Sequence, residues 1–398
     1  MRICHVAAEL LPVPPTKGGA IERWIRDAAG RLVRRGHEVH VVSRDHGDGA
    51  RSMTEAGVQY HFVNIPPRLD TGLPAAVARG LFYYRRARSI VSSIMPDVVH
   101  HHSRPAGLWL CGGPWRSVIS LHSMDYGWGF GYRGWDRPLF TRGLQSASRV
   151  LCVSNFIRQH TVERYPSIAA LATTVYNGVD ADTFTPRESS EGGQPTVLYV
   201  GRVEERKGVH VLLDAFERLI SPRVPGARLR IVGPASYWKR GDNGYYDTLS
   251  QRCAANPRID LRGPTYDDGE LSEIYRSATV AVVPSTFPEA LGLTSLEAQA
   301  SGVPVVVSDA GGLPETVAPG RSGLVFANRN VEQLGELVVD VLGNQERRRS
   351  MALAAREWAT TTFSWDVIAA RLESEYGRVT GTPAHGTAPL RQGYRGQA

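Results

Sequence analysis

Residues 196–220 read TVLYVGRVEERKGVHVLLDAFERLI, and this stretch decides the fold. An apolar, β-branched run ends at Gly201, a polar turn closes at Lys207-Gly208, and apolar residues then recur at helical spacing from Val209 to Ile220. A strand, a glycine-bearing turn and an amphipathic helix in this order open a βαβ unit. The segment therefore predicts a doubly wound α/β half, which binds ligands at the carboxyl ends of its strands.

The same alternation extends in both directions from this stretch. Downstream, strands are predicted at 227–232, 259–262, 280–284, 304–308 and 323–326, and helices at 331–342, 345–363 and 365–379. Upstream, an apolar run at 2–8, a Pro-rich turn and a helix at 20–35 lead through Gly36 into a second strand at 37–42. Other upstream predictions are strands at 59–63, 98–101, 117–120 and 149–153 and a helix at 77–94.

The length of the chain and a polar stretch near its middle predict two domains. At 398 residues the chain exceeds the size at which one hydrophobic core stops growing. The polar stretch 187–194 marks a linker between the halves. We predict α/β domains at 1–180 and 195–364 that face a shared cleft. We also predict a disordered tail at 380–398, because its last residues show no hydrophobic periodicity.

Composition narrows the class of protein. With 42% hydrophobic and 21% charged residues the chain is typical of globular proteins, and its net charge of +7 favours an anionic partner. No basic block alternates with aromatic residues, so we expect no nucleic-acid binding. The Arg-rich helix segment 79–88 is a candidate for peripheral contact with anionic lipid. The four separated cysteines, the start of the chain and the lack of an 18-residue apolar run predict a reduced, cytoplasmic protein without a membrane span.

The sharpest local feature is FPEALGL (287–293), which runs into a helix carrying Glu297. Glu289 and Glu297 stand eight residues apart, so both carboxylates can face one cleft. Between them, the amides of Leu291, Gly292 and Leu293 lie at a helix N-terminus, where unpaired N–H groups and the helix dipole bind phosphate. The alternative is a capped helix with two solvated glutamates.

Positive groups are predicted at the same sheet edge. Arg202 and Lys207 follow the strand at 196–200, where they can stabilise the negative charge on a departing diphosphate without a metal ion. As an alternative, they are surface charges at a loop. Gly18 and Gly19 offer a second amide-rich helix N-terminus in the first half, or simply a tight turn. Neither half carries GxGxxG or a P-loop, which argues against a nucleotide-linked oxidoreductase.

Three more segments contain polar groups at strand ends. His122 follows a strand, where it can bond a sugar hydroxyl or serve only as a core histidine. For His100-His101-His102 we expect no metal site, because adjacent strand residues point to opposite faces and no carboxylate or cysteine lies at ligand spacing. Glu315, after a glycine-rich turn, is either a ligand contact or a charge at its own helix N-terminus.

Together these motifs resemble the family-four retaining glycosyltransferases of the GT-B fold, over nearly the whole chain except the last twenty residues. The Lys17-Gly-Gly-Ala-Ile-Glu22 form is most similar to bacterial spore-coat-type glycosyltransferases. The resemblance implies an N-terminal acceptor-binding domain, a C-terminal donor-binding domain, and a helix at about 365–379 that crosses back onto the first. It implies transfer of a hexose or related sugar, with retention of anomeric configuration, from a nucleotide-diphosphate sugar such as a UDP-sugar. It implies no metal or other cofactor.

The resemblance also assigns roles to single residues. Arg202 and Lys207 clamp the diphosphate, and Glu289 and His122 bond the donor sugar. The remaining donor contacts are Gly18 and Gly19 at a phosphate, Leu291, Gly292 and Leu293 through their amides, Glu297 at the ribose, and Gly233 and Tyr266 near the base. The aromatic loop after His122 is the candidate acceptor site, with Asp125, Tyr126, Trp128 and Tyr132 as contacts or as packing residues.

The acceptor and the assembly are left open by the sequence. A small molecule, a saccharide or a lipid all present the hydroxyl that the predicted reaction needs, and no feature predicts an oligomeric state. The competing hypothesis is a catalytically inactive nucleotide-sugar-binding or scaffold protein with the same fold.

Overall fold

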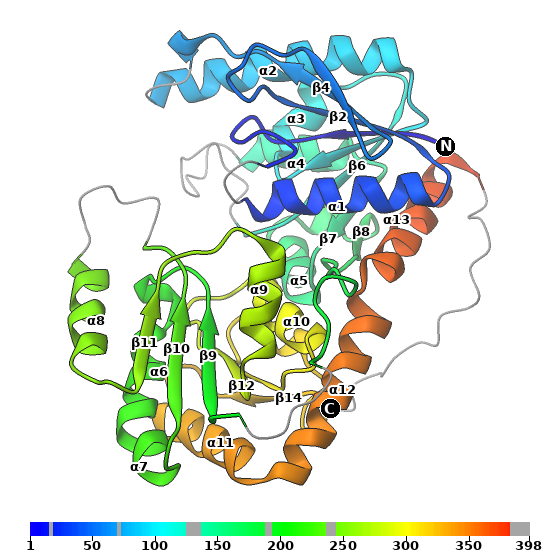
Figure 1. Cartoon of the computed structure of the whole chain (residues 1–398). Helices are drawn as coiled ribbons and strands as arrows, with labels where there is room; N and C mark the ends of the chain where they lie inside the picture. The colour runs from blue at the N-terminus through cyan, green and yellow to red at the C-terminus, as the bar shows by residue number, and fades with distance from the viewer. Residues whose placement is uncertain (16–18, 70–72, 125–136, 188–192, 236–243, 383–398) are drawn as a thin grey trace.

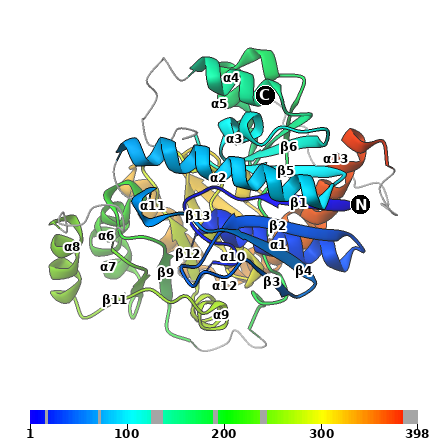
Figure 2. The same ribbon diagram turned by 90° about the horizontal axis from the view of Figure 1, so that it is seen from above.

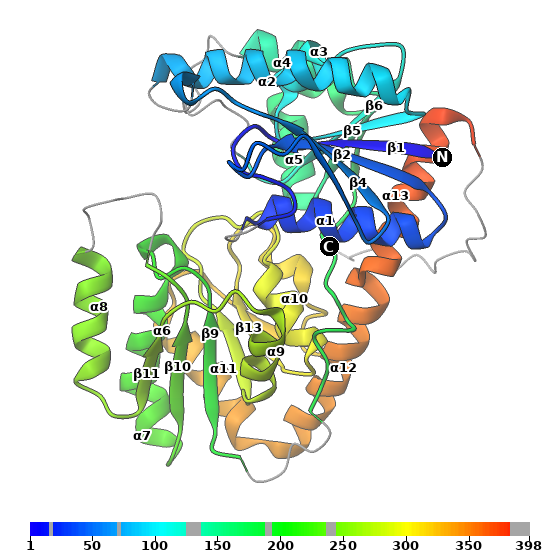
Figure 3. The same ribbon diagram turned by 45° about the horizontal axis from the view of Figure 1, so that its top comes forward.

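The computed structural model describes residues 1–15, 19–69, 73–124, 137–187, 193–235 and 244–382. It confirms the predicted α/β class: two parallel-sheet halves lie one above the other, with α1 between them (Figures 1 and 3).

The first half is built on an eight-stranded sheet of order β3-β4-β2-β1-β5-β6-β7-β8. All its pairs are parallel except β3 with β4. Its strands are β1 (Arg2–Val6), β2 (Glu38–Arg44), β3 (Ser52–Glu55), β4 (Val58–Val63), β5 (Val98–His102), β6 (Arg116–Leu121), β7 (Arg149–Cys152) and β8 (Ala172–Thr174). Its helices are α1 (Ala20–Arg34), α2 (Leu73–Ile94), α3 (Pro105–Leu110), α4 (Arg137–Gln145) and α5 (Asn155–Arg164).

Helices cover both faces of this sheet. Tyr83 and Tyr84 of α2 pack with Val6 and Val99 on one face, and Figure 2 shows α2 lying across the strands. On the other face Trp24 of α1 joins a second apolar cluster, to which the C-terminal helix α13 (Trp365–Thr380) contributes four side chains. The near-continuous apolar character of the central strands follows from this double coverage.

The second half is a six-stranded parallel sheet of order β11-β10-β9-β12-β13-β14, the order of a doubly wound Rossmann-like domain. Its strands are β9 (Thr196–Val200), β10 (Arg228–Val232), β11 (Ile259–Arg262), β12 (Val280–Val283), β13 (Val305–Ser308) and β14 (Gly323–Phe326). Its helices are α6 (Val209–Ala215), α7 (Ser221–Arg223), α8 (Gly244–Ala254), α9 (Asp268–Arg276), α10 (Leu293–Ala300), α11 (Val331–Gly343) and α12 (Gln345–Phe363). The strand order reverses between β9 and β12, so a ligand site is expected where these two strands end.

The chain crosses from one half to the other twice, and the two crossing segments are hydrogen-bonded to each other. The Val179 amide donates to the Phe363 carbonyl (2.8 Å), and the Trp365 amide donates to the Val179 carbonyl (3.2 Å). From there α13 packs against α1, so the last helix belongs to the core of the first half (Figure 1). The two crossings lie side by side, as a hinge between the domains requires.

A few elements differ from the predictions. The strand β3 was not predicted, because all four of its residues are exposed and its sequence, SMTE, shows no apolar alternation. The strand β8 was not predicted, because it is only three residues long. The helix predicted over 209–220 is α6 followed by a π-helical segment at Phe216–Ile220. The helix α2 begins four residues earlier than predicted, at Leu73 instead of 77.

Candidate active site

Lys207 and Glu289 form an ion pair where β9 and β12 end. Lys207 Nζ donates to Glu289 Oε1 (2.6 Å), and Ser285 Oγ donates to the same oxygen (2.6 Å). Gly208 brings the two loops together: its φ is +72°, and a Cβ there would lie 1.8 Å from the Pro284 carbonyl oxygen. Only glycine allows this approach, so the sequence motif Lys207-Gly208 and the loop to Glu289 are one structural unit.

Glu289 is ionised in this setting. Burial would raise its pKa, but the Lys207 charge, the hydrogen bonds from Lys207 and Ser285, and the Arg202 charge together hold the pKa below its usual value. The Lys207 ammonium carries three N–H donors, and Glu289 takes one of them. The other two have no partner within the part of the chain that the structure describes.

Arg202 lies beside this pair but makes a different contact. Its Nη1 forms an ion pair with Glu204 Oε1 (2.6 Å), and its charge still acts on Glu289. The Tyr199 hydroxyl donates to the Arg202 carbonyl (2.6 Å) and holds the backbone of this turn. Because a guanidinium has five N–H donors in a fork, the Glu204 contact leaves donors for a second anion.

The helix α10 begins at the same place. Gly292 precedes it with φ +110°, and Leu291 is buried while Leu293 is the first helical residue. Gly311 and Gly312 pack against the backbone of Glu289 and Ala290, where a Cβ would lie 2.5 and 2.4 Å from carbonyl oxygens. Glu289 lies four residues before Leu293, the first residue of α10, and it pairs with Lys207 (2.6 Å), so this helix begins at the same sheet edge as the ion pair.

Glu297 lies on α10, four residues after its first residue, Leu293. It is buried, it accepts a hydrogen bond from the Tyr275 hydroxyl (2.8 Å), and burial raises its pKa. The charge of Arg23 on α1, in the other domain, acts on this carboxyl. Arg23 also bonds Asp268 Oδ1 (2.8 Å) on α9, so Glu297 faces the boundary between the domains.

Two predicted base contacts lie on neighbouring loops. Gly233 follows β10, with φ +150°, and a Cβ there would lie 1.9 Å from the Gly201 carbonyl oxygen. The two glycine turns after β9 and β10 are therefore in direct contact. Tyr266, between β11 and α9, is 59% exposed and so has a free surface for a planar ring.

The first domain contributes the start of α1. Gly19 is the residue before α1, with φ +112°, and a Cβ there would lie 2.3 Å from Glu22 Oε2. Glu22 is buried, and burial raises its pKa to about 7, which limits its negative charge beside this helix N-terminus. Gly18 and the acceptor candidates Asp125, Tyr126, Trp128 and Tyr132 lie outside the described residues.

His122 is half-buried at the end of β6, and the structure connects it to other histidines. Its Nε2 lies 3.1 Å from His102 Nδ1, and His102 Nε2 lies 3.1 Å from His5 Nδ1. His5, His100 and His102 share one face of the sheet and bring ring nitrogens within 4.8 Å of one another, a grouping that the spacing of histidines along β5 alone does not predict.

Most of the nitrogens of these three rings already have hydrogen-bond partners. Both His100 nitrogens are bonded, Nδ1 to the Tyr376 hydroxyl (2.6 Å) and Nε2 to Ser120 Oγ (2.8 Å). The His100 and His102 rings stack with centroids 4.4 Å apart. His5 and His102 belong to a hydrogen-bonded row that continues to His122, and His100 lies beside that row.

Glu315 has a role that neither interpretation of the sequence included. Its carboxylate accepts from the amides of Asn155 (2.7 Å) and Phe156 (2.8 Å) at the start of α5, and from the Tyr176 hydroxyl (3.0 Å). These groups belong to the first domain and its link to the second. Glu315 thus binds a helix N-terminus across the domain boundary.

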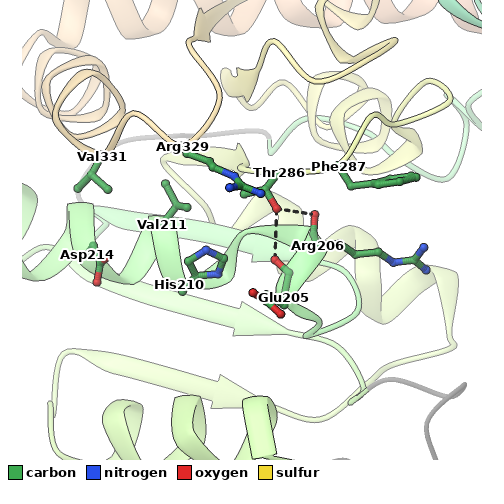
Figure 4. Close-up of a pocket in the computed structure, with 9 residues that line it drawn as sticks. All are labelled: Glu205, Arg206, His210, Val211, Asp214, Thr286, Phe287, Arg329 and Val331. Atoms are coloured by element: carbon green, nitrogen blue, oxygen red, sulfur yellow. Dashed lines mark hydrogen bonds between the residues drawn. The ribbon is translucent and has the colours of Figure 1, made fainter.

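A pocket of about 420 Å³ lies beside the Lys207 loop (Figure 4). Thr286 Oγ1 lies 3.4 and 3.3 Å from the carbonyl oxygens of Glu205 and Arg206 and ties the β12 loop to the β9 loop. The pocket carries charges of both signs, and it is lined by none of the predicted site residues that the structure describes. Its walls support the loop that positions Lys207.

Comparisons with known proteins find relatives for both halves of the chain. Residues 18–183 match the family model "Glycosyltransferase Family 4", and residues 180–358 match "Glycosyl transferases group 1". The chain is 27% identical to spore coat protein SA of Bacillus subtilis, over 94% of this chain and 99% of that one. It is 28% identical to the GDP-mannose-dependent alpha-(1-6)-phosphatidylinositol monomannoside mannosyltransferase of Mycobacterium tuberculosis, over 90% and 94% of the two chains.

Among solved structures, the chain resembles the Anabaena protein HepE, solved in complex with UDP and glucose, with a TM-score of 0.70 and 18% identity over 94% of this chain and 98% of that one. This likeness concerns the fold. With the two matched halves and the site at the strand ends, it leads to one conclusion: the chain belongs to the family-four glycosyltransferases with the GT-B fold, and it is similar to the spore-coat type.

Proposed function

We propose that the protein transfers a hexose or related sugar from a nucleoside-diphosphate donor to a hydroxyl acceptor, with retention of anomeric configuration and without a metal ion. The observation that carries this proposal is the Lys207–Glu289 pair beside the amides of α10. Cations and helix amides suit a diphosphate, and an ionised carboxylate suits sugar hydroxyls.

In this mechanism charge develops on the leaving diphosphate as the sugar becomes oxocarbenium-like. Lys207, Arg202 and the α10 amides stabilise that charge, which replaces the role that a metal ion has in other transferases. Glu289 and His122 bond the sugar, and Glu297 bonds the ribose. The acceptor attacks from the face that the diphosphate leaves, and a phosphate oxygen takes its proton.

The donor proposal includes the nucleotide. UDP is the first candidate, because the HepE structure contains UDP, and GDP is the alternative, because the mannosyltransferase relative depends on GDP-mannose. For the acceptor we propose a hydroxyl of a small molecule, saccharide or lipid, bound by the first domain. Asp125, Tyr126, Trp128 and Tyr132 are the proposed contacts.

A transfer assay with UDP-, GDP- and ADP-sugars, in EDTA, tests the reaction. The product is expected to have the donor's anomeric configuration, read from the anomeric proton coupling in its NMR spectrum, and EDTA should not lower the rate. An inverted product, or a rate lost in EDTA and restored by Mg²⁺, would contradict the mechanism. Binding of a donor without turnover with any acceptor would favour the inactive, scaffold-type alternative.

We also propose that α2 brings the enzyme to an anionic membrane surface. Arg85, Arg86 and Arg88 are exposed on α2, and Leu81 is 41% exposed on the same helix. Arg86 lies over the Phe82 ring at 5.5 Å. Basic and apolar groups on one exposed helix suit the lipid interface. Among the described residues no helix has the length and apolar character to cross a bilayer.

Neutralising these three arginines to glutamine is expected to weaken binding to phosphatidylglycerol vesicles roughly 100-fold, at about 1 kcal/mol per charge. Co-sedimentation at low salt measures the effect. A matched control removes the same charge from the other domain, through Arg218→Gln, Arg223→Gln and Arg262→Gln, and should bind as the wild type does. If the wild type does not bind these vesicles at low salt, the membrane proposal is wrong.

A further inference from the structure

Four histidines lie on one face of the first sheet. The parallel register pairs His5 of β1 with His100 of β5, and His102 of β5 with Ser120 of β6. His122 is two residues beyond Ser120 and so lies on the same face. Three of the four are fully buried, beneath Trp24 of α1 and Tyr376 of α13.

Three of these rings form a hydrogen-bonded chain that ends at His122, beyond the carboxyl end of β6. His5 Nδ1 bonds His102 Nε2, and His102 Nδ1 bonds His122 Nε2, both at 3.1 Å. His122 is the only half-buried member, and its Nε2 is engaged by His102, which leaves Nδ1 to bond a ligand. At the other end, the buried His5 Nε2 has no hydrogen-bond partner among the described residues.

All three rings are neutral at physiological pH. Burial lowers the pKa of His5 and of His122 to about 3, and burial together with the neighbouring histidines lowers that of His102 well below its usual value. A neutral imidazole has one N–H and one lone pair. The chain can therefore have only two states, with all its N–H groups pointing toward His122 or all pointing toward His5.

The unpartnered atom at the inner end decides between these states. If the N–H groups point toward His5, then His5 Nε2 is a buried N–H without an acceptor. If they point toward His122, His5 Nε2 is a bare lone pair. In folded proteins an orphaned buried N–H group is rarer than a buried acceptor with an unpaired lone pair, so the second state is favoured. The chain therefore runs from His5 Nδ1–H to His102 and from His102 Nδ1–H to His122.

We propose that His5 and His102 are positioning residues that hold His122 in the tautomer with its proton on Nδ1, so that His122 donates a hydrogen bond to an oxygen of the donor sugar. The identity of the ligand rests on the proposed function; the tautomer does not. In this arrangement His122 cannot accept a proton from the sugar hydroxyl. It serves as a fixed hydrogen-bond donor. The two buried histidines behind it, His102 and His5, determine which of its ring nitrogens carries the proton.

Long-range ¹H–¹⁵N NMR of the ¹⁵N-histidine-labelled protein tests the tautomer directly. The free wild-type protein is expected to show a pyrrole-type Nδ1 and a pyridine-type Nε2 for His122, with its signals assigned by their loss in His122→Gln. His102→Leu removes the donor to Nε2. In this variant the Nε2–H form should become populated, and kcat/KM for sugar transfer should fall about tenfold.

Two further variants separate positioning from general damage. His102→Asn places an amide N–H near the former Nδ1 and should restore both the tautomer and most of the rate. His101→Leu, on the opposite face of the same strand, replaces a buried histidine without hydrogen-bond partners among the described residues and should change neither the tautomer nor the rate.

A wild-type His122 with its proton on Nε2 would overturn the inference whatever the activity. So would a folded His102→Leu with unchanged tautomer and unchanged kcat/KM. Absence of transfer by the wild type would count against the proposed function alone.

Discussion

Replacing Lys207 with alanine is expected to lower kcat by about 10²–10³-fold, the effect of removing one preorganised donor to a developing anion. Lys207 lies 2.6 Å from Glu289 and has two further N–H donors for the diphosphate. Its removal also leaves Glu289 without its main counter-charge, so the pKa of Glu289 should rise toward the value that burial favours. Steady-state kinetics with a saturating donor measures the loss.

Arg206→Ala is the matched control for this prediction. Arg206 is the preceding residue on the same loop, its side chain is 44% exposed, and it lies over the Phe287 ring, not over the ion pair. Its removal should change kcat by less than about fivefold, because exposed contacts of this kind contribute less than about 1 kcal/mol. If Lys207→Ala remains folded and is as active as this control, Lys207 does not stabilise the leaving group.

Replacing Trp365 with alanine is expected to lower the free energy of unfolding by about 3–5 kcal/mol, the usual cost of deleting a large buried aromatic. Trp365 is 4% exposed and packs edge-on against Trp24 of α1, with ring centroids 5.6 Å apart. A Cβ on Gly178 would lie 2.3 Å from its ring, so the chain crossing also closes over it. Urea unfolding followed by circular dichroism gives the change.

Leu353→Ala on α12 controls for the loss of an apolar side chain from the C-terminal helices. Leu353 is 76% exposed, so its removal should change stability by no more than about 0.5 kcal/mol. An equal, small effect at Trp365 would show that α13 does not depend on this contact to dock onto α1.

The fold could be predicted because its signals are local. Apolar runs that end at Gly201 or Gly36 and lead into or out of helices define βαβ units without any long-range knowledge. The site motifs also have local signals. Gly208, after Lys207, and Gly292, before α10, both have positive φ angles, which favour glycine. These motifs stand at strand ends, and the parallel topology brings strand ends together.

The remaining contacts of the site could not be predicted, because they join residues that are far apart in the sequence. The histidine chain needs the register of β1 on β5 and of β5 on β6, which unites residues 97 and 20 positions apart. The Glu315 contact with α5 needs the placement of one domain on the other, over about 160 positions. Ser285, which bonds Glu289, did have a local signal, since it follows a predicted strand directly.

Calorimetric titration of the wild type with UDP, GDP, ADP and their sugars, in EDTA, tests the central claim most directly. The claim is that the β9 and β12 loops and the start of α10 bind a nucleoside diphosphate through Lys207 and Arg202. Saturable binding of at least one nucleoside diphosphate is predicted, with at least about tenfold weaker binding to Lys207→Ala, since the loss of a charged hydrogen bond costs about 1.5–3 kcal/mol. A folded wild type that binds none of these ligands would contradict the claim.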